Sequence, residues 1–395
     1  MNCSTVDIPI HFTKRYDDIM VSRLKVMTIV GTRPEIIRLS EVIKCLDRYF
    51  THLLVHTGQN WDYTLSRVFF EELQLREPDC YLDVAGASLG ETMGNIIARS
   101  YDVLQREKPD ALLVLGDTNS ALSVIPAKRL KIPVFHMEAG NRCFDENVPE
   151  EINRRIVDHI SDINLAYTEH SRRYLLAEGI KGDRIFVTGS PMREVLLKNS
   201  EAIAVSRVLE KLSLRPKGYF LVSAHREENI DNEDNFFSLM NAINVVAERY
   251  DMPVVYSVHP RSRNRIESRG FIFRDNVMEL QPFGFHDYIK LQQNAYCVLS
   301  DSGTLSEESA ILGFSGVLIR TSTERPEVLD AGSIVIGGIS EEDILSAIDL
   351  AVNMQQTLGN SVSVNDYSDA NVSVKVAKII ESYVKIIDSI VWRKT

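Results

Sequence analysis

Short apolar runs alternate with amphipathic segments along almost the whole chain. The run at residues 111–115, for example, is followed by polar positions and then by a second run at 133–135. Segments between such runs, among them 34–50, 91–107, 150–160, 234–250 and 342–354, carry apolar residues at helical spacing. Buried strands that alternate with helices are typical of parallel βαβ units. The predicted strands cover residues 24–30, 52–56, 111–115, 133–135, 163–166 and 185–187, then 219–224, 253–258, 276–280, 296–299, 316–319 and 333–336.

The chain of 395 residues is longer than one hydrophobic core usually serves, so we expect two domains. A polar stretch at 199–218 separates the two sets of strands. The predicted organisation is an N-terminal extension at 1–20, a Rossmann-like domain at 21–200, a second at 201–370 and a C-terminal helix at 371–395. That helix fits either domain. Two doubly wound α/β domains that face a central cleft would bind ligands at the carboxyl ends of their strands.

Charge and composition narrow the possible partners. The net charge of −11 argues against nucleic acid, because proteins that bind phosphate backbones carry basic surfaces. The five cysteines are scattered and form no CxxC pair, which is typical of reduced cytosolic thiols. No apolar run approaches the roughly 18 residues that span a bilayer, and residues 1–20 lack the apolar core of a signal peptide. We therefore expect a cytoplasmic protein with no membrane partner.

Acidic and basic side chains gather after the strand at 133–135. Glu138 and Arg142 follow it directly, and Glu150 and Arg154 come within the next 20 residues. Carboxylates transfer protons, whereas guanidinium groups hold phosphate through paired hydrogen bonds. The alternative is an ion-pair network on a helix surface, since Glu150 and Arg154 are four residues apart.

The motif Gly-Thr-Arg-Pro-Glu at 31–35 joins the first strand to the first helix. A helix N-terminus with Arg33 beside it and Arg38 one turn on is suited to an anion. An ordinary strand–helix turn is the alternative. No GxGxxG occurs in the chain, which argues against enzymes that use a bound nicotinamide.

Asp117 ends the strand at 111–115, at the same edge of the sheet as Glu138. It can cap the following helix, or it can join Glu138 in a carboxylate cluster. Clustered carboxylates raise one another's pKa, and one of them then becomes a proton donor near neutral pH.

The second set of strands also ends in polar groups. His225 and His259 follow two strands, each near an arginine, and suit phosphate or hydroxyl binding. Ser302 and Gly303 offer backbone amides at the next helix start, as a phosphate cradle without a Walker lysine. Thr304 and Glu307 fit a capping box, which leaves Glu308 to point at the ligand, towards ribose hydroxyls. Zinc-binding spacings are absent from the sequence, so we expect no metal, and the sequence leads us to predict no cofactor either.

Taken together, these motifs resemble the non-hydrolysing UDP-N-acetylglucosamine 2-epimerases. The resemblance runs in order from about residue 24 to 354. It is carried by Gly-Thr-Arg-Pro-Glu at 31–35, Gly-Asp-Thr at 116–118, Glu-Ala-Gly at 138–140, Pro-Glu-Glu-x-Asn-Arg at 149–154, His-Arg at 225–226, Asp-Ser-Gly at 301–303 and Thr-Glu-Arg-Pro-Glu at 323–327.

The resemblance implies the GT-B architecture, with a UDP-N-acetylhexosamine substrate in the cleft between two Rossmann-like domains. It also implies elimination of UDP across C1–C2 and re-addition, with inversion at C2. The implied catalytic residues are Asp117, Glu138, Glu150 and His225. Those implied to bind UDP or sugar are Arg33, Arg38, Arg154, Tyr288, Ser302, Gly303, Thr304, Glu308 and Arg325. We expect a homodimer, and the family implies a product used in a surface polysaccharide such as O-antigen or capsule.

Two segments indicate a branch within the family. Residues 144–149 and 56–63 are more similar to enzymes that form UDP-N-acetyl-L-fucosamine from UDP-2-acetamido-2,6-dideoxy-L-talose. We therefore predict this substrate, with the UDP-N-acetylglucosamine/UDP-N-acetylmannosamine pair as the alternative.

Three positions depart from the pattern common among relatives. Arg38 stands where many have Lys, Thr304 where Gly is frequent and Asn60 where many have His. The last change bears on a second UDP-sugar site that some bacterial members use for activation. A hydrolysing 2-epimerase, a GT-B glycosyltransferase and a UDP-sugar sensor are the other functions that this set of residues allows.

Overall fold

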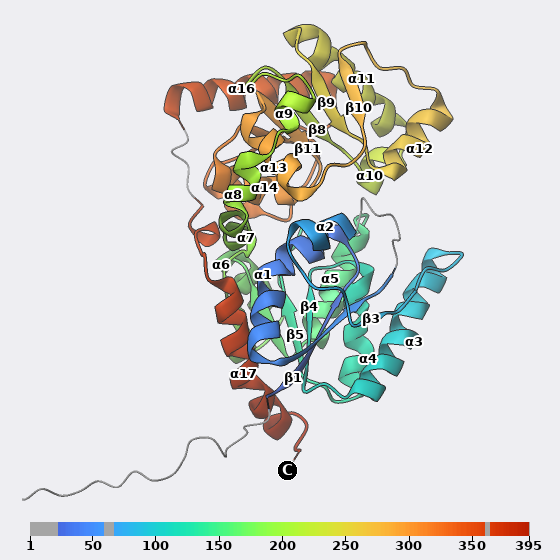
Figure 1. The fold of residues 1–395 in the computed structure, drawn as a ribbon, viewed down its shortest axis with the longest axis vertical. Helices are drawn as coiled ribbons and strands as arrows, with labels where there is room; N and C mark the ends of the chain where they lie inside the picture. The colour runs from blue at the N-terminus through green and yellow to red at the C-terminus, as the bar shows by residue number, and fades with distance from the viewer. Residues whose placement is uncertain (1–22, 59–66, 360–363, 395) are drawn as a thin grey trace, which may run out of the picture.

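The computed structural model describes residues 23–58, 67–359 and 364–394. The predicted extension at 1–20 and positions 59–63 of the branch-specific segment, Asn60 among them, lie outside the described residues. Two parallel sheets, one per half of the chain, lie one above the other (Figure 1).

The first sheet has seven strands in the order β3-β2-β1-β4-β5-β6-β7. All pairings are parallel, and β1 lies centrally between β2 and β4. Apolar runs with both faces covered form such strands, which is why β4 is buried at all five positions. The strands are β1 (Lys25–Val30), β2 (Thr51–His56), β3 (Cys80–Tyr81), β4 (Ala111–Leu115), β5 (Val134–Met137), β6 (Ile163–Ala166) and β7 (Ile185–Val187).

The second sheet repeats this arrangement with six parallel strands in the order β10-β9-β8-β11-β12-β13. Each strand again follows a helix, so that all carboxyl ends lie at one edge. The strands are β8 (Phe220–Ser223), β9 (Val254–Ser257), β10 (Val277–Leu280), β11 (Cys297–Ser300), β12 (Gly316–Leu318) and β13 (Val335–Ile336).

Helices cover the sheets and connect their strands (Figure 1). In the first half they are α1 (Arg33–Tyr49), α2 (Arg67–Glu72), α3 (Leu89–Glu107), α4 (Val124–Arg129), α5 (Pro149–Ile160), α6 (Glu169–Ala177), α7 (Met192–Lys198), α8 (Ser200–Val205) and α9 (Val208–Lys211). In the second half they are α10 (Glu227–Ile230), α11 (Glu233–Tyr250), α12 (Pro260–Arg269), α13 (Phe285–Asn294), α14 (Thr304–Leu312), α15 (Pro326–Asp330), α16 (Glu341–Leu358) and α17 (Val372–Ile390). Short 3-10 turns lie at Asn119–Ser123, Gly182–Arg184 and Asn365–Tyr367.

The final helix, α17, returns to the first half of the molecule. It packs along α1 (Figure 1). Its buried face, with Val376, Ile380 and Val384, joins the core cluster that contains Leu39 and Ile43 of α1. The last segment of the chain therefore belongs, by packing, to the first sheet.

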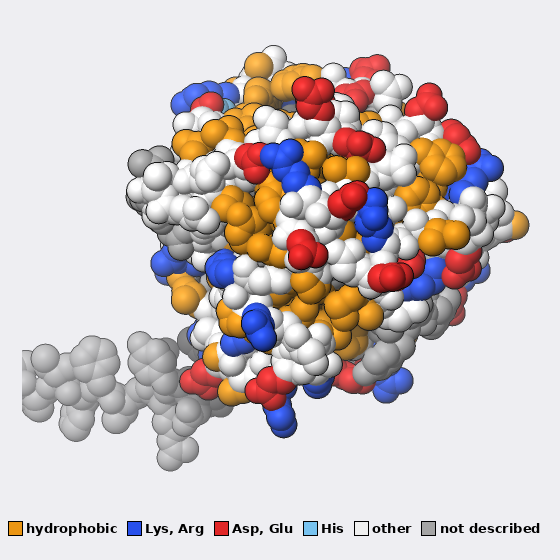
Figure 2. Space-filling view, turned by 90° about the horizontal axis from the view of Figure 1, so that it is seen from above, with side chains coloured by type: hydrophobic (Ala, Val, Ile, Leu, Met, Phe, Trp, Pro, Cys, Tyr) orange, Lys and Arg blue, Asp and Glu red, His pale blue; other side chains and the backbone are white. Residues whose placement is uncertain are grey.

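The predicted strands and helices are found with small shifts at their ends. The sequence pattern does not predict strand β3, because its two residues are too few to show an alternation of apolar and polar positions. Among the described residues, no helix is both long and apolar enough to cross a membrane. On the face of the second half seen in Figure 2, acidic and basic side chains are interspersed rather than gathered into one basic surface.

Candidate active site

The three predicted acids line one cavity of about 280 Å³ between the two halves. Asp117 follows β4, Glu138 follows β5 and Glu150 lies in the first turn of α5. The opposite wall comes from the second half and includes His225, Ser302, Gly303, Thr304, Arg226 and Glu324. We call this space the acid cavity.

A second cavity of about 60 Å³ adjoins the first. Its wall carries three of the predicted binding residues, Arg33, Tyr288 and Glu308, together with aromatic and apolar side chains. Arg38, His225, Ser302 and Thr304 line both spaces, along with Pro34, so the two are neighbours. We call the smaller space the aromatic cavity; the residues unique to it are Arg33, Ile37, Phe69, Met192, Phe283, Gly284, Phe285, Tyr288 and Glu308.

Glu138 has a strained backbone, with φ at +64° in the left-handed region that non-glycine residues rarely occupy. Two residues on, Gly140 has φ at +83°, and a Cβ there would lie 2.5 Å from the carbonyl oxygen of Ser171. Only glycine fits that position. Residues held in such conformations cluster at functional sites, because the surrounding structure must stabilise them.

Asp158 supplies that stabilisation from α5. Its carboxylate accepts hydrogen bonds from the Gly140 amide at 3.2 Å and from Arg142 at 2.8 Å, and it lies 2.9 Å from His136 Nδ1. The other ring nitrogen of His136 lies 2.8 Å from the carbonyl oxygen of Gly116. One buried carboxylate thus links the loops that carry Glu138 and Asp117.

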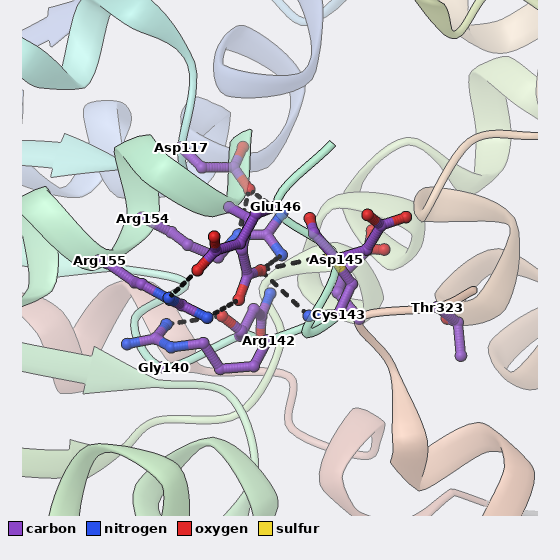
Figure 3. Close-up of polar contacts among 12 residues, drawn as sticks. Asp117, Gly140, Arg142, Cys143, Asp145, Glu146, Arg154, Arg155 and Thr323 are labelled. Carbon is purple, nitrogen blue, oxygen red and sulfur yellow. Dashed lines mark hydrogen bonds and ion pairs between the residues drawn. The ribbon is translucent and has the colours of Figure 1, made fainter. Parts of the chain in front are cut away.

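Asp117 is held by Arg154 (Figure 3). The guanidinium donates to Asp117 Oδ2 from Nε at 3.0 Å and from Nη2 at 2.6 Å, and its third nitrogen donates to Glu151 at 2.9 Å. Arg154 is almost fully buried and is not among the residues that line the acid cavity. It was predicted to bind the ligand, but its contacts are those of a group that orients Asp117.

Glu150 has a different environment from its two neighbours. Burial raises the pKa of its carboxyl group, and the nearby negative charge of Asp117 raises it further, while Arg226 and Arg154 act in the opposite direction. A carboxyl group whose pKa is raised keeps its proton closer to neutral pH. Glu150 is thus suited to give a proton.

Glu138 belongs to a ring of four buried charges. Arg38 and Arg325 each donate to its carboxylate, Arg38 also donates to Glu307 at 2.8 Å, and Arg325 forms an ion pair with Glu307 at 2.7 Å. Arg325 is not among the residues that line either cavity, and Arg38 lines both. Predicted as ligand contacts, these two guanidiniums are already paired with carboxylates.

The prediction of a capping box at Thr304 and Glu307 is wrong. Helix α14 begins at Thr304 after Gly303, with no side-chain hydrogen bond at the cap. The Glu307 carboxylate turns inward to Arg38 and Arg325 because burying it requires opposite charges.

His225 lines both cavities, and Asp301 sets its orientation. The ring nitrogen Nδ1 lies 3.2 Å from one Asp301 oxygen, and the backbone amides of His225 and Arg226 donate to the other at 2.8 and 2.9 Å. Burial alone would raise the pKa of Asp301, but the charge of His225 and these hydrogen bonds lower it to about 2. The ring of His259 lies 5.6 Å away, and burial lowers its pKa to about 4.

The loop at 302–304 reaches the cavities as predicted, but two of its amides are used internally. Ser302 donates its N–H to Ser300 Oγ at 3.1 Å, and Thr304 donates its N–H to Ser302 Oγ at 3.4 Å. A Cβ at Gly303 would lie 2.3 Å from Glu324 Oε1, which explains the glycine. The hydroxyl groups of Ser302 and Thr304 remain at the cavity wall.

In the aromatic cavity, Glu308 accepts a hydrogen bond from Gln292 at 2.6 Å. Burial raises the pKa of Glu308 and of Tyr288, and burial lowers that of Arg33, whose guanidinium lies over the Phe69 ring at 5.8 Å. Cavity walls of this kind, with aromatic rings and a few polar groups, suit a flat organic ligand.

Several cavity residues carry no signal that the sequence analysis used. Phe283 lies between β10 and α13, and Phe285 is the first residue of α13; neither belongs to a motif. Glu35 lies in the first motif but was given no role. It accepts from the amides of Gly31 and Thr32 and from the hydroxyls of Thr118 and Ser120, so it joins the two strand-end loops.

Among the described residues, no group of three or more His, Cys, Asp or Glu side chains is arranged to hold a metal ion.

Comparisons with known proteins agree with this geometry. A family model described as UDP-N-acetylglucosamine 2-epimerase matches residues 44–381. A solved UDP-N-acetylglucosamine 2-epimerase from Rickettsia bellii is 46% identical, covers 94% of this chain and 100% of its own, and superposes with a TM-score of 0.87. The Methanocaldococcus jannaschii enzyme, solved in complex with UDP-GlcNAc and UDP, is 33% identical over 91% of this chain and 99% of its own, with a TM-score of 0.86.

A curated relative from Pseudomonas aeruginosa has a different substrate in its name. This UDP-2,3-diacetamido-2,3-dideoxy-D-glucuronate 2-epimerase is 34% identical over 82% of this chain and 91% of its own length. The predicted GT-B arrangement of two parallel α/β sheets is confirmed by the structural matches. The chain belongs to the non-hydrolysing UDP-N-acetylglucosamine 2-epimerase family and is an isomerase, a UDP-N-acetylhexosamine 2-epimerase.

Proposed function

We propose that the chain interconverts UDP-N-acetylglucosamine and UDP-N-acetylmannosamine by inversion at C2. The observation that carries this proposal is the acid cavity, where Asp117, Glu138 and Glu150 face His225 across the two halves. The names of the similar enzymes from Rickettsia and Methanocaldococcus support this substrate pair over the L-talo substrate. The predicted L-fucosamine branch has no such support.

The chemistry requires two steps, because no carbonyl group makes the C2 hydrogen acidic. In the first step, a base removes the proton from C2, the C1–C2 double bond forms, and the C1–O bond breaks with both electrons leaving on UDP. In the second step, a proton is added to the opposite face of C2 and UDP oxygen re-forms the bond to C1. After both steps, the group that took the proton from C2 is protonated and the group that gave a proton to C2 is deprotonated. Atoms and charge balance once both groups have exchanged a proton with water.

We assign proton removal to Glu138 and proton delivery to Glu150. Glu138 pairs with two guanidiniums and, as an anion, has only acceptor capacity. Glu150 carries the raised pKa that suits a proton donor. Asp117, next to Glu150 and held by Arg154, is placed to exchange that proton with its neighbour.

UDP would span both cavities in this proposal. The aromatic cavity would take the nucleoside, with Glu308 and Tyr288 near the ribose and Arg33 beside them. The wall that the cavities share, with His225, Ser302 and Thr304, would hold the diphosphate between the two steps. Retaining UDP there distinguishes an epimerase from the hydrolysing alternative.

The L-talo derivative is the second candidate, favoured by the sequence of residues 144–149. This segment directly precedes Glu150, so it lies close to the acid cavity. Because the reaction involves only C1 and C2, a 6-deoxy sugar needs no change in the catalytic groups.

Proton NMR in D2O tests both substrates. Purified protein would be incubated separately with UDP-N-acetylglucosamine and with UDP-2-acetamido-2,6-dideoxy-L-talose. A C2 epimer that keeps UDP and carries deuterium at C2 supports an epimerase, and the substrate that is turned over decides the pair. Free UDP with free sugar would move the chain to the hydrolysing class, and no change with either would contradict the proposal.

A further inference from the structure

The ring of four buried charges draws equally on both halves of the molecule. Arg38 and Glu138 come from the first half, and Glu307 and Arg325 from the second. The exposed fraction of all four side chains is 9% or less. Because charges alternate around the ring, each carboxylate meets two guanidiniums and each guanidinium meets two carboxylates.

Glu307 is the member farthest from solvent, with a side chain that is 0% exposed. One of its oxygens accepts from Arg38 and forms an ion pair with Arg325, and the other accepts from Ser190 Oγ. Glu307 is not among the residues that line either cavity, whereas Glu138 and Arg38 do line the acid cavity. The contacts that link Glu307 to the acid cavity run through the two arginines, because Arg38 lines that cavity and both arginines pair with Glu138.

Glu138 needs such support because its own backbone is strained. Its φ lies in the left-handed region, and each of its carboxylate oxygens accepts from one arginine. Asn141 adds a weaker contact at 3.3 Å. Arg38 reaches Glu138 through Nη1 and Glu307 through Nη2, whereas Arg325 reaches both carboxylates through Nη2, so Glu307 lies against both guanidiniums that hold Glu138.

We infer that Glu307 is a positioning residue for catalysis, which aims the Glu138 carboxylate through Arg38 and Arg325 across the boundary between the two halves. This inference rests on the proposed role of Glu138. Positioning of the base then depends on both halves of the molecule, because each half supplies one carboxylate and one guanidinium of the ring. A cluster that served stability alone would be replaceable by apolar groups, since buried ion pairs contribute little net stability.

The test compares two buried glutamates. Glu307→Ala removes the anchor of both arginines, and Glu194→Ala is the matched control. Glu194 is also almost fully buried, accepts from the amide and hydroxyl of Ser373 at 2.9 and 2.5 Å, and is not among the residues that line either cavity. Both variants should lower the melting temperature.

Only Glu307→Ala should lower kcat, by about 100-fold, the usual scale for a misplaced catalytic group, with KM and UDP affinity within about threefold. Glu307→Gln keeps an acceptor oxygen in the same place and should recover about tenfold of that loss. Equal kcat values for Glu307→Ala and Glu194→Ala would overturn the inference, as would a loss confined to KM. If Glu307→Ala does not fold, Glu307→Gln and Ser190→Ala decide it, because a positioning role predicts that each lowers kcat while UDP affinity is kept.

The outcome stays separable from the proposed function. If the wild-type protein inverts C2 of neither nucleotide sugar, the proposed function fails. A crystal structure of Glu307→Ala bound to UDP then decides the inference on its own terms. A displaced Glu138 carboxylate would support it, and an unmoved one would overturn it.

Discussion

The two cavities differ in chemistry although they share a wall. The acid cavity, about 280 Å³, is lined by carboxyl groups and by the arginine and histidine side chains that face them. The aromatic cavity, about 60 Å³, is lined by Phe69, Phe283, Phe285 and Tyr288 with a single carboxyl group, Glu308. In the proposed function, proton transfer takes place in the acid cavity and the nucleoside binds in the aromatic cavity. Substitutions in the acid cavity should therefore affect mainly turnover, and substitutions in the aromatic cavity should affect mainly binding.

The largest effect should follow Glu138→Gln, which removes the proposed base and leaves the aromatic cavity intact. We expect kcat to fall by about 10³-fold, within the range for general acid–base groups, and the Kd for UDP to stay within a few-fold. Steady-state kinetics and calorimetric titration with UDP measure the two quantities. Full activity would remove Glu138 from the mechanism.

Glu150→Gln should lower kcat by roughly 10²-fold and also change its pH dependence. Because Glu150 must be protonated to act as an acid, wild-type activity should decline as pH rises through its raised pKa. The variant has no such group and should lose that basic limb, as a pH–rate profile would show. If the variant keeps the same fall in activity at high pH, a group other than Glu150 causes that fall.

Glu308→Ala should weaken substrate binding with little change in turnover. Loss of a hydrogen bond to a charged group is worth about 1.5–3 kcal/mol, so we expect KM to rise by roughly 10- to 100-fold. Glu210→Ala is the matched control, because Glu210 is exposed and pairs only with Arg207 among the described residues. A fall in kcat as large as the rise in KM would contradict the separation of the two cavities.

Tyr288→Phe should have the smallest effect, since it removes one hydroxyl from the aromatic cavity and keeps the ring. A neutral hydrogen bond contributes about 0.5–1.5 kcal/mol, so UDP affinity should weaken by up to roughly tenfold. Calorimetry with UDP alone measures it without reference to turnover. An unchanged Kd would place the hydroxyl outside the UDP contacts.

Local patterns predicted most of the fold. The strands at 111–115, 163–166 and 185–187 match β4, β6 and β7 residue for residue, because short and mostly apolar runs flanked by polar turns favour strands that are covered on both faces. The prediction that Asp117 lies near Glu138 followed from strand ends that share one edge, whereas Glu150 comes from the first turn of α5.

The contacts between halves could not be predicted in this way. Thr304 and Glu307 have the spacing of a capping box. The Glu307 carboxylate instead turns inward to side chains that are distant in the sequence, among them Arg38, which is 269 positions away. Arg154 resembles a ligand-binding arginine until its pairing with Asp117 is seen. Which charge faces a ligand and which faces another charge depends on tertiary packing.

The return of α17 to α1 has a consequence for how the chain matures during synthesis. Domains usually form in the order in which they leave the ribosome. Here the first core lacks Val376, Ile380 and Val384 until the last residues have been made. The half that is translated first is therefore the half that is finished last, and a nascent chain stopped at 371 would expose the apolar surface of α1 that α17 covers.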